Sequence, residues 1–288
     1  MQIARIDVPT NILNSFISKH GEHEAMIWVD NVTKLIDVLS TEWGFTPTGT
    51  LSGGTKSVCI TGNHSNRKAV LKISPVEEMG IHEIEALAAW QGHKVPQIIA
   101  IHGDNSTFLM EYLEPVEEFA SLHHIFDLAS GLHSRNHTNF CFPDLRQNVA
   151  MRFGWASKRV EAQAGTEYAN DILKARAIAD QLLDSTTRVS LLHGDFQMKN
   201  IINTPSGPHA IDPMPCVGDS LFDLALWLVC SSLDTNLATS LLECENRMHA
   251  DEYQRFLLWL WCVEVLEQTT AKTQSSQEKR KIIQNAMS

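Results

Sequence analysis

The chain has 288 residues, with 23 Lys and Arg against 34 Asp and Glu, so its formal net charge at pH 7 is −11. This acidic balance argues against a general affinity for nucleic acid or for an anionic membrane, and it suits a cationic ligand. No apolar run approaches the ~20 residues that span a bilayer, and the first ten residues lack the features of a signal peptide, so we expect a cytoplasmic protein. A chain of this length favours two packed lobes over one core.

The first part of the chain predicts two helices followed by a sheet. Between residues 11 and 39, apolar residues recur at spacings of three and four, which indicates two amphipathic helices around Gly21. Over residues 49–73, segments rich in Val, Ile and Thr alternate with Gly and Asn turns, which predicts three antiparallel strands. One more helix and two more strands complete a five-stranded sheet, over residues 79–90, 98–102 and 107–112.

The remainder of the chain predicts a mainly helical lobe. Five segments carry helical periodicity: 119–133, 147–164, 172–185, 220–233 and 251–268. The exception is 191–215, where two short apolar segments flank polar residues as in a hairpin. We expect the polar tail after Thr269 to fray. The fold class is therefore α+β, with an N-terminal lobe over 1–112, a linker over 113–116 and a mainly α C-terminal lobe over 117–288.

Three oxygen-bearing side chains follow one another in the order that phosphoryl transfer requires. Asp195 is followed after five residues by Asn200 and, after a short hairpin, by Asp212. Transfer needs a carboxylate that accepts the proton of a hydroxyl, and hard oxygen ligands that place magnesium on the phosphates. We predict Asp195 as the catalytic base, and Asn200 and Asp212 as ligands of Mg²⁺. Each of the three residues alone is compatible with an ordinary turn, but their joint order favours catalysis.

The same segment resembles the signature of the aminoglycoside phosphotransferases and choline-kinase-like enzymes, which is His-Gly-Asp, four residues, Asn and then a hydrophobic-Asp segment. The runs Ile211-Asp212-Pro213, Val217-Gly218-Asp219 and Phe222-Asp223-Leu224-Ala225 look like the streptomycin 6-kinase and hydroxyurea phosphotransferase branch. The resemblance covers nearly the whole chain and departs from the family pattern at Phe196-Gln197, where Leu-His is more usual. It implies a bilobal protein-kinase-like fold that binds ATP between its lobes.

The resemblance also implies nucleotide-binding residues in the first lobe. Lys72 matches the strand lysine that grips the α- and β-phosphates, and Glu83 on the following helix is a better candidate for its partner than Glu85. The turn Ser52-Gly53-Gly54 matches the segment that covers the phosphates, although it lacks the GxGxxG pattern and is not a Walker A motif. Two backbone groups match the hinge that binds adenine: the C=O of Glu111 and the N–H of Leu113.

Other family positions imply structural roles. His193 is expected to brace the catalytic loop, and Asp223 on the next helix is expected to accept hydrogen bonds from that loop. Asp219 is either similar or lines the substrate side. Lys199, beside Asn200, is a candidate for steadying the γ-phosphate, and an exposed loop lysine is an equally good interpretation.

A cationic acceptor requires carboxylates that face the site, because ammonium and guanidinium groups bind best to charged acceptors. The candidates on the helices are Glu161, Glu167, Glu264 and Glu267, and the alternative for each is a solvated helix face. By resemblance the leading substrate is streptomycin, phosphorylated at its 6-hydroxyl. The alternatives are a metabolic kinase for another small hydroxylated molecule and a non-catalytic kinase-like module that binds nucleotide or a partner protein. The joint presence of Lys72 and the three motif residues favours catalysis.

Overall fold

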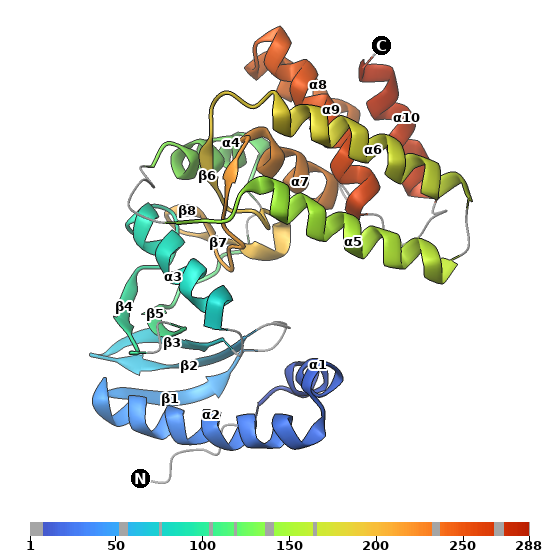
Figure 1. Ribbon diagram of the computed structural model, residues 1–288. Helices are drawn as coiled ribbons and strands as arrows, with labels where there is room; N and C mark the ends of the chain where they lie inside the picture. Colours follow the sequence, from blue (N-terminus) through green and yellow to red (C-terminus); the bar gives the residue numbers. More distant parts are fainter. Residues whose placement is uncertain are drawn as a thin grey trace. The chain divides into compact units, whose positions relative to one another are not determined.

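The computed structural model describes residues 8–51, 57–74, 77–103, 106–117, 120–135, 141–163, 166–231, 237–267 and 274–287. The chain forms two compact units, Met1–Glu114 and Pro115–Ser288 (Figure 1). The boundary between them falls within residues 113–116. The first unit holds a five-stranded sheet and the second is mainly helical, so the predicted α+β class is confirmed.

The first unit is built on an antiparallel sheet with the strand order β1-β2-β3-β5-β4. Its strands are β1 (Phe45–Thr50), β2 (Val58–His64), β3 (Arg67–Ile73), β4 (Ile98–Ile101) and β5 (Thr107–Glu111), and its helices are α1 (Thr10–His20), α2 (Glu22–Glu42) and α3 (Glu77–Trp90). The β2–β3 turn places Ser65 and Asn66 at φ 48° and 64°. Two successive residues with positive φ match the twist of a tight hairpin. The resulting register sets Lys72 opposite Cys59.

Helix α2 covers the sheet with its apolar face. Val32, Ile36 and Leu39 recur at spacings of four and three, and each is no more than 3% exposed. They join one hydrophobic cluster with residues of β1, β2 and β3, among them Phe45 and Leu71. This packing supports the strands from the side of α2.

The second unit is organised around one buried helix. Its helices are α4 (Leu122–His133), α5 (Leu145–Gln163), α6 (Thr166–Asp184), α7 (Leu221–Ser231), α8 (Leu237–Arg247), α9 (Ala250–Glu267) and α10 (Gln274–Met287). Helix α9 is buried without interruption from Trp259 to Leu266, and a helix that is buried all round belongs to a core. The Trp259 ring meets Phe222 of α7 edge-on, with 5.4 Å between the ring centroids.

Two short antiparallel pairs interrupt the helices of this unit. They are β6 (Ser190–Leu192) with β9 (Cys216–Gly218), and β7 (Ile201–Thr204) with β8 (Gly207–Ala210), the latter preceded by the 3₁₀ turn η1 (Met198–Asn200). The sequence predicted a single hairpin-like region here, and the structure adds the β6–β9 pair around it. In the ranges that the structure describes, no helix is long and apolar enough to cross a membrane.

The sequence predicts fraying of the polar tail after Thr269, but part of this tail forms a helix. Helix α10 is mostly polar, yet Ile283 is 1% exposed and Arg280 forms an ion pair with Glu264 of α9. A few tertiary contacts therefore hold a segment whose own sequence is a weak helix signal.

The close approach of β1 to β2 predicts a sharp difference between two glycines of the sheet. A Cβ added at Gly62 would lie 2.4 Å from the backbone oxygen of Thr46, whereas one at Gly49 would lie 3.4 Å from Thr61 Oγ1. We expect Gly62→Ala to lower the free energy of unfolding by about 1–3 kcal/mol through overpacking. Gly49→Ala, the matched control, is expected to change it by less than about 1 kcal/mol. Chemical denaturation measures both, and equal effects would contradict this packing.

Candidate active site

The candidate site is built on the loop that follows β6. Leu192 of β6 pairs with Cys216 of β9, so the chain leaves one strand and enters the other at the same end of the pair. Two backbone hydrogen bonds join the segments that emerge there. Met214 N–H donates to the carbonyl of His193 at 2.8 Å, and Ile211 N–H donates to the carbonyl of Asn200 at 2.9 Å. The two halves of the predicted motif thus lie side by side.

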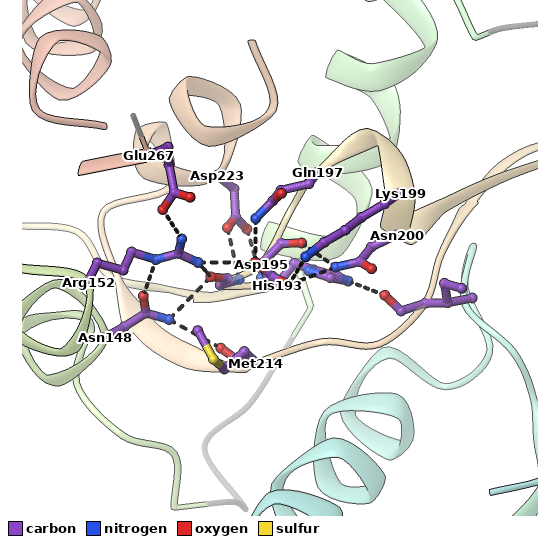
Figure 2. A network of polar contacts seen from close by, with 12 residues as sticks. Asn148, Arg152, His193, Asp195, Gln197, Lys199, Asn200, Met214, Asp223 and Glu267 are labelled. Atoms are coloured by element: carbon purple, nitrogen blue, oxygen red, sulfur yellow. Dashed lines mark hydrogen bonds and ion pairs between the residues drawn. The ribbon is translucent and has the colours of Figure 1, made fainter. Parts of the chain in front are cut away.

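Asp195 and Asn200 contact each other directly (Figure 2). The amide nitrogen Nδ2 of Asn200 donates to the backbone carbonyl of Asp195 at 2.8 Å and to its carboxylate Oδ2 at 2.9 Å. Both residues are buried, at 8% and 5% exposure. Because the amide nitrogen faces Asp195, the amide oxygen of Asn200 points away from it.

Asp212 lies next to this pair along the chain. It follows Ile211, whose N–H is bound to Asn200, and its φ of 54° places it in the left-handed region that Asp tolerates better than most side chains. Its side chain is exposed. The structure therefore brings the main chain of Asp212 beside Asn200, at one end of the β7–β8 hairpin.

The oxygen donors fit a hard cation better than a soft one. Among the described residues, no group of three or more His, Cys, Asp or Glu side chains is placed to hold a metal ion. A site made of the Asn200 amide oxygen and the Asp212 carboxylate suits Mg²⁺, which commonly takes one or two protein oxygens and completes its shell with phosphate and water. The residues therefore fit the ion that the sequence predicts.

One buried carboxylate anchors the start of the loop. Asp223 of α7 is 0% exposed, and its two oxygens accept the backbone N–H groups of His193 at 2.7 Å and of Gly194 at 2.9 Å. His133 Nε2 lies 2.9 Å from the same carboxylate. Gly194 has a φ of 72°, and a Cβ on it would lie 2.0 Å from the carbonyl oxygen of Met214. Only glycine fits at this crossing of the two segments.

His193 has a structural position rather than a place at the reacting groups. Burial lowers the pKa of its imidazole, which favours the neutral ring. The neutral ring donates from Nε2 to the carbonyl of Ile211 at 2.9 Å, which ties the loop to the end of β8. The bracing role that the family resemblance implies for His193 stays a prediction.

Three further residues contact the Asp195 carboxylate, and the sequence indicated a role for only one of them, Lys199. Oδ1 accepts from Arg152 Nη2 at 3.2 Å and from Gln197 Nε2 at 2.6 Å, and Lys199 Nζ lies 3.4 Å from Oδ2. Gln197 is one of the two positions, with Phe196, where this chain departs from the family pattern. The sequence feature that could have indicated Arg152 is its position on the same face of α5 as the buried residues Val149 and Phe153.

Two of the predicted substrate carboxylates are occupied within the protein. Glu264 is 2% exposed and its Oε2 accepts from Arg280 Nε at 2.8 Å. Asp219 is 6% exposed and its Oδ2 accepts from Arg255 Nε at 2.6 Å and from Trp259 Nε1 at 2.7 Å. For Glu264, burial and the ion pair argue against the predicted contact with a substrate. For Asp219, they favour the structural one of the two roles that the sequence left open.

The remaining candidate substrate carboxylates are Glu267, Glu161 and Glu167. Glu267, at the end of α9, keeps 22% of its side chain exposed and pairs with Arg152. The side chains of Glu161 and Glu167 lie outside the described residues.

The first unit holds a buried ion pair at its predicted nucleotide-binding residues. Lys72 of β3 and Glu83 of α3 are 3% and 6% exposed, and Lys72 Nζ donates to Glu83 Oε1 at 2.6 Å. Glu111 ends β5, and its N–H donates to the carbonyl of Gln97 at 3.0 Å. Leu113 follows two residues later and is half-buried. The predicted turn Ser52-Gly53-Gly54 lies outside the described residues.

Comparison with known proteins gives one family and one fold. The family model for aminoglycoside/hydroxyurea antibiotic resistance kinases matches residues 42–251. No curated protein matches the chain significantly.

Among solved structures, choline kinase LicA from Streptococcus pneumoniae is 14% identical over 90% of this chain and 99% of that one, with a TM-score of 0.57. Aminoglycoside phosphotransferase APH(4)-Ia is 11% identical over 89% and 97% of the two chains, with a TM-score of 0.60. A choline/ethanolamine kinase family protein from Mesorhizobium loti is 13% identical over 82% and 86%, with a TM-score of 0.55. At these identities the likeness shows a shared kinase-like fold.

The anchoring role of Asp223 gives a stability prediction. Asp223→Asn keeps the shape of the side chain but turns an amide NH₂ towards one of the two backbone N–H groups, which leaves that buried group unsatisfied. We expect the free energy of unfolding to fall by about 1–3 kcal/mol. Asp127→Asn removes a carboxylate that is 64% exposed and is expected to change it by less than about 0.5 kcal/mol. If Asp223→Asn leaves the free energy of unfolding unchanged, the loop does not depend on this carboxylate.

Proposed function

The chain belongs to the family of aminoglycoside/hydroxyurea antibiotic resistance kinases, and on that premise we propose that it transfers the γ-phosphate of ATP, with Mg²⁺, to a hydroxyl of a small cationic molecule. The leading acceptor is an aminoglycoside of the streptomycin type. The kinase activity follows from the family, whereas the acceptor, its hydroxyl and the metal are the parts proposed. The observation that carries the proposal is the buried contact between Asp195 and Asn200, with Asp212 beside it.

We assign Asp195 to the acceptor hydroxyl. Its carboxylate is held by donors on both oxygens, which fixes its direction before a substrate binds. As the oxygen of the acceptor bonds to the γ-phosphorus and the bond to the β-phosphate oxygen breaks, the hydroxyl proton passes to Asp195 and ADP leaves. The carboxylate mainly orients the hydroxyl, because little proton transfer is needed in a loose transition state.

The remaining motif residues act on the phosphates. Asn200 and Asp212 would hold Mg²⁺ through oxygen atoms, and the ion would neutralise charge on the β- and γ-phosphates. In the first unit, Lys72 is kept in a fixed direction by Glu83 and would contact the α- and β-phosphates. The backbone groups of Glu111 and Leu113 are proposed for the adenine, and Ser52-Gly53-Gly54 for the phosphate-covering turn.

The acceptor is proposed to be cationic. The net charge of −11 favours a cation electrostatically, and a thermostable mutant of APH(4)-Ia has been solved as a ternary complex with ADP and hygromycin B. A small amino alcohol is the second candidate, because two of the similar structures are choline or choline/ethanolamine kinases. The two classes differ in acceptor only, so a substrate screen separates them.

The test is ATP consumption in the presence of streptomycin, other aminoglycosides, hydroxyurea and choline, with mass spectrometry of the product. We expect one aminoglycoside to gain a single phosphoryl group, and Asp195→Asn to lower kcat by about 10²–10⁴-fold while ATP affinity changes little. Asp184→Asn is the matched control, since its carboxylate is 73% exposed and pairs with Arg146. Wild-type turnover in Asp195→Asn would refute the assignment of the base. If choline alone is phosphorylated, the acceptor is an amino alcohol and not an aminoglycoside.

A further inference from the structure

We propose that Arg152 is a positioning residue, which holds the Asp195 carboxylate in the direction needed for transfer and is itself held by Glu267. This inference rests on the proposed role of Asp195. Figure 2 shows Arg152 between the two carboxylates, with Asn148 beside it. No feature of the motif pointed to Arg152, which lies on α5, more than 40 residues before Asp195 in the chain.

The guanidinium connects the main chain of the loop with the side chain of Asp195. Nη2 donates to the carbonyl of Gly194 at 2.8 Å and to Asp195 Oδ1 at 3.2 Å. A single nitrogen that is bound to both atoms fixes the carboxylate relative to its own backbone. Nε donates to Asn148 Oδ1 at 2.9 Å, and Asn148 Nδ2 donates to the carbonyl of Gly194 at 3.2 Å. Two side chains one turn apart on α5, Asn148 and Arg152, therefore both bind the loop that carries Asp195.

Glu267 supplies the opposing contact. Arg152 Nη1 donates to Glu267 Oε1 at the end of α9, so the guanidinium is held between α9 and the loop. Arg152 is 2% exposed. Burial opposes its charge, but Glu267 and Asp195 together outweigh burial and raise the pKa of the guanidinium. Arg152 is therefore a permanent cation that cannot turn towards solvent.

Packing alone does not account for this residue. A buried charge is expensive to desolvate, and apolar side chains of similar volume often serve stability equally well. Helix α5 also has a second arginine on the same face: Arg159 donates from Nη2 to the carbonyl of Leu266 on α9. Arg159 joins the same two helices without touching the catalytic loop. Of these two arginines, Arg152 is the one that contacts the Asp195 carboxylate and can act on its direction.

The expected result is a separation between turnover and binding. Arg152→Met removes the fork but keeps the apolar stem, and we expect kcat to fall by at least about 30-fold because a misdirected group at the reacting atoms is costly. The KM for ATP should stay within about twofold. Arg152→Lys keeps the charge without the planar fork and should recover only part of kcat. Arg159→Met, the matched control, should leave kcat within about twofold of wild type.

Crystal structures of the wild-type and Arg152→Met proteins give a readout that needs no activity. We expect the Asp195 carboxylate to swing away from its wild-type direction in the variant. An unchanged direction, a wild-type kcat in Arg152→Met, or an equal loss in Arg159→Met would each overturn the inference. If Arg152→Met does not fold, Arg152→Lys and Glu267→Gln are compared in the same way, since each weakens one end of the contact. If the wild-type protein phosphorylates no acceptor, the proposed function fails, and the direction of Asp195 in the structures still decides the inference.

Discussion

The candidate site depends on one buried carboxylate that binds main chain rather than substrate. Asp223 accepts the two successive backbone N–H groups that precede Asp195, so the loop is tied to α7 at the point where it leaves β6. Two hydrogen bonds to a charged acceptor in a buried place are strong, and they replace the sheet bonds that the loop gives up. The left-handed Gly194 allows Met214 to approach from the other side. The direction of Asp195 is then set by side chains around it.

Internal charge pairing is the second constraint on this unit. Arg152, Arg255 and Arg280 each bind carboxylates from other elements. Paired in this way, charges are tolerated in the interior of a protein. A negative net charge therefore does not translate directly into an acidic substrate surface, since Asp219 and Glu264 belong to these internal pairs. The net charge of a sequence gives the sign of the electrostatic field around the protein, but it does not show which carboxylates face a ligand.

The sequence predicted the features that depend on local pattern. The α+β class, the five strands and the order of Asp195, Asn200 and Asp212 follow from periodicity and motif spacing, and the spacing of Lys72 and Glu83 follows from the family pattern. What the sequence missed or left open depends on tertiary contacts. It missed the burial of Glu264 beside α10 and the contact of Arg152 with the loop, and it left the role of Asp219, which pairs with Arg255, undecided. A charged side chain on an apolar helix face is ambiguous until its partner is known, because the partner lies far away in the chain.

The most direct measurement is a crystal structure of the protein with ADP, Mg²⁺ and the acceptor identified by the screen. We expect a metal ion bound by the Asn200 amide oxygen and the Asp212 carboxylate, with the acceptor hydroxyl within hydrogen-bond distance of Asp195. A metal ion held elsewhere, or an acceptor hydroxyl directed away from Asp195, would contradict it.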